Sequence, residues 1–356
     1  MFKPITLGAI ECANRFLMAP LTRCRATAGT HVPQDIVAEH YAQRASAGLL
    51  IAEATMVAPN TSAFWMEPGV YSEEQVAAWK KVTDAVHAKG GKIILQIWHG
   101  GRAGHPLNND GAEQVAPSAI AIAHHITGEM NPTGEKMDNA LPRALTLEEI
   151  PAVVAQFAAA AKNAVAAGFD GVEIHGANGY LIDQFLRSSA NQRTDAYGGP
   201  LENRARFLLE VVDAVAAAIG KGRVGVRLSP LNSYNSMKDE DPIALTAYVC
   251  AELEKRGLAF VHVMRADFFQ AQTGDVLTPA RAALKTTPLV VNMGYTPEEA
   301  EEGVAKGAFD AVAFGTKFLA NPDLPERVKA GAKLNDPDPA TFYTHDAKGY
   351  TDYPFM

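Results

Sequence analysis

Short apolar runs alternate with longer amphipathic segments along most of the chain. The apolar runs are nearly continuous in Val, Ile and Leu, which is typical of parallel strands covered on both faces. They predict strands at residues 15–20, 49–57, 92–98, 171–176, 224–230, 259–265, 288–294 and 311–316. Eight such strands separated by helices favour an α/β protein with a (β/α)₈ TIM barrel over a doubly wound open sheet.

The segments between these runs carry helix start and stop signals. Ser72 is followed by acidic residues, and the apolar pattern after it stops at Gly90, so a helix is predicted between them. Thr146 and Glu149 have the spacing of a capping box, which predicts a helix start at Thr146. Thr296 precedes a proline and predicts the N-cap of a further helix.

Two segments interrupt the repeat. Residues 1–14 precede the first strand and are predicted to form a hairpin that closes the bottom of the barrel. Residues 100–145, after the third strand, are rich in Gly, Pro and Asn and too long for an ordinary loop, so we expect a lid or a wall of the substrate site. No linker divides the chain, and residues 1–356 are expected to form one domain.

Composition excludes several classes of protein. The chain is 47% hydrophobic and carries a formal net charge of −8, which argues against a general nucleic-acid-binding protein. Cys12, Cys24 and Cys250 form no CxxC pair, so neither a zinc site nor an iron–sulfur cluster is expected, and no metal is predicted. Without a signal-peptide pattern or a membrane-spanning apolar run, the protein is expected to be cytoplasmic.

Hydrogen-bonding residues gather where the predicted strands end. In a TIM barrel the catalytic groups lie at the C-terminal ends of the strands. His175, Asn178 and Tyr180 follow one another within "HGANGY", which is either a satisfied loop or the floor of an active site. Carboxylate pairs and lysines are scarce at these ends, so glycosidase and Schiff-base chemistry have little support.

Several sequence blocks together resemble the old yellow enzyme family of FMN-dependent ene-reductases, from residue 2 to the end of the chain. These blocks are "APLTR" (19–23), "LQIWHGGR" (95–102), "HGANGYLIDQFL" (175–186), "NQRTDAYGGPLENR" (191–204), "VRLSP" (226–230), "ANPDLPERV" (320–328) and "GYTDYPF" (349–355). The resemblance implies one FMN lying across the top of the barrel.

The resemblance assigns residues to the cofactor. Thr22 would donate to the flavin C4 carbonyl, Gln96 would bond the pyrimidine edge, and Arg227 would lie beside N1 and O2, where negative charge collects on reduction. The full set of implied FMN-binding residues is Pro20, Leu21, Thr22, Ala54, Gln96, Arg227, Gly294, Gly315 and Thr316.

The resemblance also assigns the chemistry. His175 and Asn178 would hold the carbonyl or nitro oxygen of an activated alkene, on which charge develops as hydride reaches the β-carbon. Tyr180, protonated at neutral pH, would deliver a proton to the α-carbon. The residues implied as pocket walls are Phe64, Trp65, Trp98 and Tyr343.

No GxGxxG motif follows a first strand, so a Rossmann site for a nicotinamide is not expected. NADPH or NADH would then use the same pocket as the alkene in a ping-pong sequence, and family habit favours NADPH. A monomer or a homodimer is expected, acting on a small molecule and binding neither nucleic acid nor membrane.

One position departs from the family pattern. Thr316 stands where relatives usually carry an arginine for the FMN phosphate, and Lys317 is displaced by one residue, which predicts weaker FMN retention. Two alternative functions remain open for the same set of residues. The first is a reductase of nitrate esters or nitroaromatics acting at the same site, and the second is a flavin-free barrel that only binds ligands.

Overall fold

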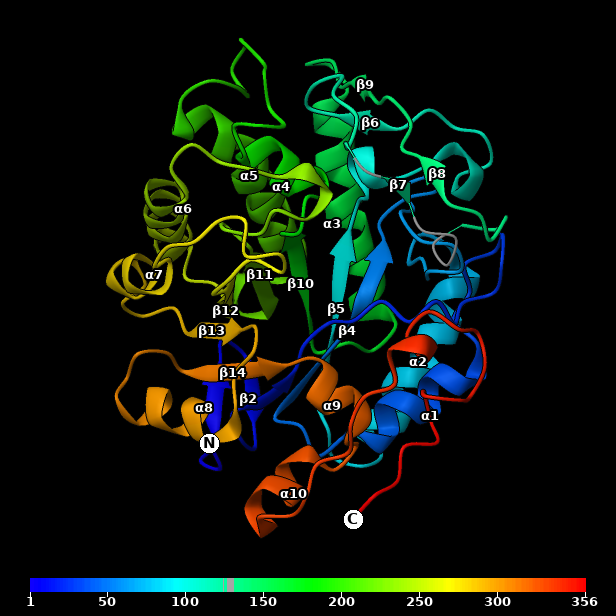
Figure 1. Cartoon of the computed structure of the whole chain (residues 1–356), viewed down its shortest axis with the longest axis vertical. Helices are drawn as coiled ribbons and strands as arrows, with labels where there is room; N and C mark the ends of the chain where they lie inside the picture. The colour runs from blue at the N-terminus through cyan, green and yellow to red at the C-terminus, as the bar shows by residue number, and fades with distance from the viewer. Residues whose placement is uncertain (124, 127–130) are drawn as a thin grey trace.

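In the computed structural model, which describes residues 1–123, 125–126 and 131–356, eight parallel strands close into a barrel (Figure 1). Each predicted strand is confirmed to within a few residues. The barrel strands are β3 (Phe16–Met18), β4 (Leu49–Met56), β5 (Ile93–Trp98), β10 (Gly171–Gly176), β11 (Val224–Leu228), β12 (Phe260–Met264), β13 (Leu289–Asn292) and β14 (Ala311–Phe314). The predicted TIM barrel is therefore correct.

Helices surround the barrel and cover its outer face (Figure 1). They are α1 (Asp35–Gln43), α2 (Glu73–His87), α3 (Ile150–Ala166), α4 (Leu181–Leu186), α5 (Leu201–Ile219), α6 (Pro242–Arg256), α7 (Leu277–Ala283), α8 (Pro297–Ala305), α9 (Thr316–Ala320) and α10 (Leu324–Ala330). No helix in the described ranges has both the length and the apolar character needed to cross a membrane.

Two of the three predicted helix starts are confirmed, and the third is wrong by four residues. The Ser72 side chain accepts from the backbone N–H of Gln75 in a full capping box, and Thr296 caps α8 through Glu299. Helix α3 begins at Ile150 instead of Thr146. The Glu149 carboxylate does accept the Thr146 backbone N–H at 2.8 Å, as in a capping box, and it also binds Arg143. A proline follows Ile150 and favours a first helical turn there.

The predicted N-terminal hairpin closes the bottom of the barrel. Strands β1 (Ile5–Leu7) and β2 (Ile10–Cys12) pair in antiparallel register, and Ala9 N–H donates to the Gly222 carbonyl oxygen over 2.7 Å. The turn glycine Gly8 has φ +60°, and a Cβ there would lie 2.4 Å from the Gly222 oxygen, so no other residue fits. Leu7 and Ile10 are buried in the inner core of the barrel.

The long loop after β5 carries short helices and strands of its own. These are η1 (Gly101–Ala103), η2 (Pro106–Asn108), β6 (Val115–Ala116), β7 (His125–Ile126), β8 (Met137–Asp138) and β9 (Arg143–Ala144). The Asn109 side chain ties the loop to the backbone N–H and carbonyl of Ser62, at 2.8 and 2.9 Å.

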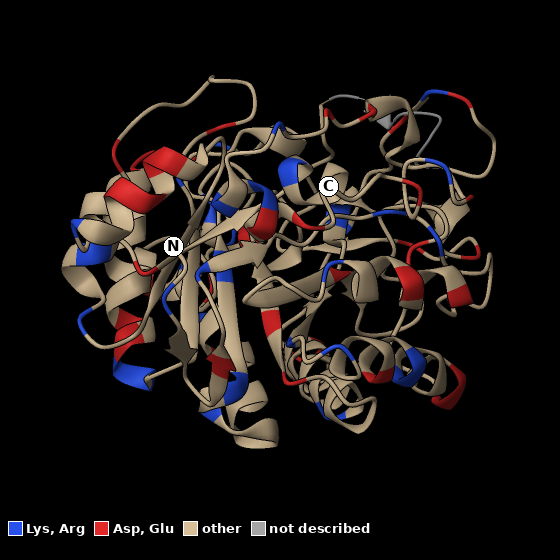
Figure 2. Cartoon of the chain, turned by 90° about the horizontal axis from the view of Figure 1, so that it is seen from below, with Lys and Arg blue, Asp and Glu red and all other residues tan. Residues whose placement is uncertain are grey.

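Acidic and basic residues are interspersed along the ribbon in Figure 2.

Further short 3₁₀ helices among the described residues are η4 (Lys221–Arg223), η5 (Tyr234–Ser236) and η6 (Pro339–Thr341).

Candidate active site

A cavity of about 520 Å³ opens at the C-terminal ends of the barrel strands. Every residue assigned to it from the sequence, Trp65 excepted, lines this one cavity. These residues are Pro20, Leu21, Thr22, Ala54, Phe64, Gln96, Trp98, His175, Asn178, Tyr180, Arg227, Gly294, Gly315, Thr316 and Tyr343. The structure therefore brings together residues from seven of the eight barrel strands or the loops that follow them.

The described part of the long loop does not form the expected wall of this cavity. Among its described residues, none lines the 520 Å³ cavity. Residues 131–134 of the loop instead line a neighbouring cavity of about 420 Å³ together with Trp65, Tyr343 and His345. Trp65 was predicted as a wall of the 520 Å³ cavity, but it lines the neighbouring one, where its ring makes an edge contact with His345 at 5.1 Å between centroids.

Several cavity residues were missed by sequence analysis. Phe268 and Phe269 follow β12 and form an aromatic wall with exposed fractions of 45% and 64%. Their positions depend on a loop conformation that no local pattern indicates. The other lining residues that were not assigned are Ala19, Tyr234, Asn292, Met293, Tyr295, Ala313 and Phe314. Asn292 and Met293 directly precede Gly294 at the end of β13, which was the available signal.

A buried carboxylate supports the floor of the cavity. Glu173 lies between Gln96, whose Nε2 donates to it over 2.7 Å, and His262, whose Nδ1 is 2.8 Å away. All three side chains are almost fully buried. Because Gln96 uses its amide nitrogen on Glu173, its carbonyl oxygen is left to accept a hydrogen bond from a ligand.

Arg227 is the uncompensated cation of this floor. It stands in register between His175 and His262 on the neighbouring strands and is 6% exposed. Its guanidinium makes no hydrogen bond within the described part of the chain, and its Nε is buried without a partner. Burial lowers the pKa of Arg227, and the Glu173 charge opposes that shift. A buried guanidinium without a partner calls for an anionic or strongly polar ligand.

His175 presents a single defined donor. Burial, and then the charge of Arg227, hold its pKa well below the usual range, so the imidazole is neutral at neutral pH. Its Nδ1 accepts from the backbone N–H of Ala177 at 3.3 Å, which leaves the proton on Nε2. Trp98 stacks on the ring at 5.7 Å between centroids and fixes its plane.

Tyr180 lies against the same two rings. Its ring meets the edges of Trp98 and His175 at centroid distances of 4.3 and 5.0 Å. Burial raises its pKa well above the usual range, so the phenol keeps its proton. A phenol held in this state is a proton donor.

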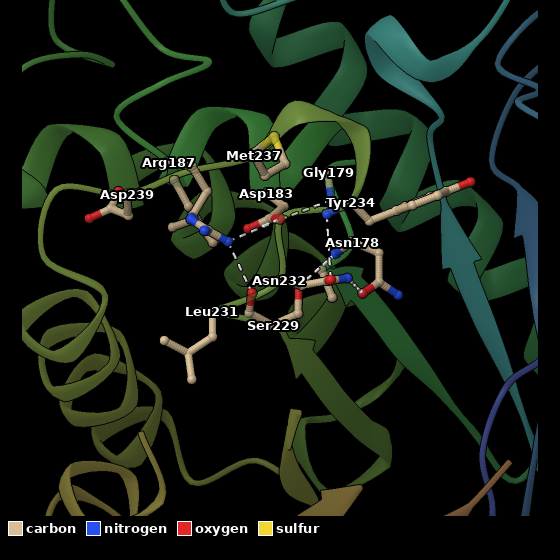
Figure 3. A network of polar contacts seen from close by, with 12 residues as sticks. Asn178, Gly179, Asp183, Arg187, Ser229, Leu231, Asn232, Tyr234, Met237 and Asp239 are labelled. Atoms are coloured by element: carbon tan, nitrogen blue, oxygen red, sulfur yellow. Dashed lines mark hydrogen bonds and ion pairs between the residues drawn. The ribbon is translucent and has the colours of Figure 1, made fainter. Parts of the chain in front are cut away.

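Asn178 sits in a left-handed turn with φ +57° between these two residues. Its side-chain oxygen accepts from Asn232 Nδ2 at 2.8 Å (Figure 3). The amide nitrogen is left as a donor on a side chain that lines the cavity.

The end of the cavity opposite His175, Asn178 and Arg227 is lined mainly by backbone. Gly294, with φ +71°, and Gly315 are its glycines, and α9 begins at Thr316. Met293, next to Gly294, has φ +91°, a conformation that L side chains rarely adopt. Lys317 is the cation that lines this end and has no ion pair with any described residue.

A buried network holds the cavity walls in place. The Glu53 carboxylate accepts the backbone N–H of Arg23, the residue after Thr22, at 3.1 Å. Burial raises the pKa of Glu53 to about 7, against the opposing effect of the Arg23 hydrogen bond and charge. The Arg23 guanidinium donates to the Phe342 carbonyl at 3.0 Å and so fixes the C-terminal segment that carries Tyr343.

These residues fit FMN. The Arg227 guanidinium, which makes no hydrogen bond to the described residues, suits the ring edge that gains negative charge. The glycines leave backbone amides accessible for a phosphate. Within the described residues no three His, Cys, Asp or Glu side chains are grouped to hold a metal ion.

Comparison with known proteins places the chain in a family. Residues 1–335 match the model of the NADH:flavin oxidoreductase / NADH oxidase family. The chain is 55% identical to a probable flavin mononucleotide-dependent alkene reductase of Leishmania infantum, covering 100% of this chain and 97% of that protein. It is 44% identical to 12-oxophytodienoate reductase 1 of Oryza sativa subsp. japonica, covering 100% and 93%.

Solved structures agree. The old yellow enzyme from Trypanosoma cruzi superposes with a TM-score of 0.97 at 44% identity, covering 99% of this chain and 98% of that one. Morphinone reductase superposes with a TM-score of 0.94 at 44% identity, covering 100% and 96%. The chain therefore belongs to the old yellow enzymes of the NADH:flavin oxidoreductase / NADH oxidase family, and it is an FMN-dependent enzyme that reduces activated C=C bonds with NAD(P)H.

Proposed function

We propose that His175 and Asn178 together hold the oxygen of an α,β-unsaturated carbonyl or nitro compound, and that Tyr180 protonates its α-carbon. The observation that carries this proposal is the fixed direction of both donors. The His175 proton is on Nε2 because Nδ1 accepts from Ala177, and the Asn178 amide nitrogen is free because its oxygen is occupied by Asn232. A donor aimed at a developing oxyanion lowers the barrier by about 3–4 kcal/mol.

When bound, FMN would supply the hydride chemistry that links a reduced nicotinamide to the β-carbon of the alkene. Thr22, Gln96 and Arg227 would hold its ring, with the Gln96 carbonyl oxygen accepting and Arg227 supplying positive charge. The other residues proposed for the cofactor are Pro20, Leu21, Ala54, Gly294, Gly315 and Thr316, which line the same cavity.

Tyr180 acts as the acid in this scheme. Its raised pKa keeps the phenol protonated, and its edge contact with His175 keeps it beside the oxygen-binding donors. Phe64, Trp98 and Tyr343 would confine the alkene, since Phe64 stacks on both other rings at centroid distances of 6.1 and 5.6 Å.

The nicotinamide and the alkene would take turns in the same cavity, which gives ping-pong kinetics. One relative, morphinone reductase, has a solved complex with tetrahydroNAD, which supports entry of a nicotinamide into the corresponding cavity here. NADPH rather than NADH is retained as the proposed donor, and the ratio of kcat/KM values for the two donors tests it.

The proposal is tested on the purified, FMN-loaded protein under anaerobic conditions. NADPH should bleach the yellow flavin band, and 2-cyclohexenone should restore it with formation of cyclohexanone. Product analysis with a nitroalkene and a nitrate ester tests the alternative, since nitrite release from the ester would identify reductive denitration. Bleaching without reoxidation by any of these compounds would contradict the proposed substrate class.

A further inference from the structure

Asn232 lies behind Asn178 and is fully buried, while lining no part of the cavity. We propose that Asn232 is a positioning residue: it fixes the direction of the Asn178 amide so that the amide nitrogen, and not the oxygen, meets the substrate. This inference rests on the proposed role of Asn178 in holding the substrate oxygen.

The direction of Asn232 is itself fixed by backbone. Its side-chain oxygen accepts from the backbone N–H of Tyr234 at 3.4 Å and from that of Phe268 at 3.3 Å. A backbone N–H can only donate, so the Asn232 oxygen must face these two groups. The Asn232 amide nitrogen then faces Asn178 and donates to its oxygen over 2.8 Å (Figure 3).

The consequence for Asn178 follows from the same rule. If its amide were rotated by half a turn, two NH₂ groups would meet and neither would have an acceptor. The carbonyl oxygen of Asn178 would then face the substrate oxygen and repel it. The backbone N–H groups of Tyr234 and Phe268 therefore determine the orientation of the Asn232 amide. That amide in turn determines that Asn178 presents its nitrogen to the substrate.

The main chain of Asn178 is held by other groups. Its N–H donates to Ser229 Oγ over 2.7 Å, and its carbonyl accepts from Asn235 Nδ2 over 2.9 Å. The Ser229 carbonyl is bound in turn by Arg187 at 3.0 Å (Figure 3). A change confined to the Asn232 side chain should therefore redirect the Asn178 amide without moving its backbone.

The chain of amides also reaches the aromatic wall. Asp267 accepts from the backbone N–H groups of Phe269, Ala271 and Gln272 and from Ser233, which holds the loop that carries Phe268. The loop that provides the aromatic wall therefore also supplies one of the two donors that orient Asn232.

Asn232→Asp is the sharpest test because it changes one group and almost no volume. A carboxylate still accepts from Tyr234 and Phe268, but it can no longer donate to Asn178. The Asn178 amide nitrogen should turn toward the carboxylate and leave its oxygen facing the cavity. The probe is 4-nitrophenolate, an oxyanion, titrated into the FMN-loaded protein and followed by the shift of the flavin absorption band.

We expect the dissociation constant of the probe to rise about tenfold or more in Asn232→Asp, and kcat/KM for 2-cyclohexenone to fall by roughly the same factor. In an Asn178→Ala background the Asn232→Asp change should alter the dissociation constant less than about twofold, since the group through which it acts is gone. Asn163→Asp removes an amide that donates to the Val70 carbonyl, outside the cavity, and serves as the matched control with wild-type values.

Three outcomes separate the possibilities. Wild-type affinity in Asn232→Asp, with weakened binding in Asn178→Ala, overturns the positioning role and leaves the proposed function intact. An equal loss in both backgrounds also overturns it, because Asn232 would then act by another route. Wild-type affinity in Asn178→Ala overturns the role of Asn178 and the inference with it. If Asn232→Asp does not take up FMN, Asn232→Ala carries the same double-variant test.

Discussion

The two ends of the cavity are built on different principles. At the inner end, His175, Asn178 and Arg227 are each no more than 9% exposed, and the donors of His175 and Asn178 are directed by a hydrogen bond on their opposite side. At the outer end, Gly294 and Thr316 are exposed, and the side-chain contact found there holds backbone, since Arg265 Nε donates to the Met293 carbonyl at 2.8 Å. From this difference we expect chemistry to depend on side-chain direction at the inner end, and binding of the cofactor phosphate to depend on backbone and Lys317 at the outer end.

The largest effect is expected at the inner end, from Tyr180→Phe. The ring contacts with Trp98 and His175 stay, but the proton donor is lost. General acid catalysis contributes roughly a hundredfold or more, so kcat for 2-cyclohexenone should fall by at least that factor. The rate of flavin bleaching by NADPH, measured separately by stopped flow, should stay near the wild-type value.

A nitroalkene provides the control for Tyr180→Phe. The nitro group stabilises the carbanion formed by hydride addition, so its flavin reoxidation step should need the phenol much less. Equal losses for the enone and the nitroalkene would show that the variant disturbs the site in general and that Tyr180 is not the acid.

A smaller effect is expected at the outer end, from Lys317→Met. A charge-assisted hydrogen bond contributes about 1.5–3 kcal/mol, and partial exposure reduces this, so the dissociation constant of FMN should rise about tenfold. Thr316→Arg, which restores a planar guanidinium for a phosphate, should tighten FMN by a similar factor. Fluorescence titration of the apoprotein measures both constants.

Riboflavin lacks the phosphate, so it tests whether Lys317→Met and Thr316→Arg change the affinity through that group. Its affinity should be the same in both variants and in the wild type. An FMN dissociation constant unchanged by Thr316→Arg would contradict the prediction of weak retention made from the sequence.

Backbone strain at the outer end gives a still smaller effect. Met293 has φ +91°, whereas glycine adopts this conformation freely. Strain of this kind costs about 1–3 kcal/mol, and the greater freedom of glycine in the unfolded chain offsets part of it. Met293→Gly should therefore raise the melting temperature by about 2 °C.

Gly294→Ala should have the opposite effect to Met293→Gly, because it introduces backbone strain instead of removing it. Its φ is +71°, and the nearest atom to an added Cβ is 3.8 Å away, so the change adds strain without a clash. It should lower the melting temperature by a comparable amount. Melting temperatures that move together in the two variants would contradict strain as the cause.

Sequence alone predicted the inner end well because strand ends in a parallel barrel meet at one place. His175, Arg227 and Gln96 needed only correct strands to be placed together. Glu173 could also have been found, since it lies two residues before His175 and so points to the same side of β10.

The outer parts were harder to predict because they depend on contacts between distant loops. Phe268 and Phe269 line the cavity through a loop held by Asp267, and no periodicity marks it. Asn232 acts through a pair of backbone groups that come from two separate loops. Trp65 was misplaced for the same reason, since its ring contacts His345, a residue 280 positions away in the chain.

The smallest effect is expected from pH, and it follows from the same burial that shapes the inner end. Burial and Arg227 keep the pKa of His175 well below its usual value of about 6.5. The group proposed to bind the substrate oxygen is therefore a neutral Nε2–H donor across the neutral range. Because Tyr180 has a pKa well above its usual value, neither group changes its charge there.

The second-order rate of flavin reoxidation by 2-cyclohexenone should thus be constant from about pH 6 to about pH 9. The sign of the effect is fixed below that range: the unfolded chain takes up the His175 proton before the folded protein does, so the stability that comes from the buried neutral ring is lost as pH falls below 6.5. His175→Asn keeps a donor but removes the titration and provides the comparison. A rate that rises or falls around pH 6.5 in the wild type, but not in His175→Asn, would mean that a charged imidazole takes part, and that the inner end is directed by charge instead of by hydrogen-bond geometry.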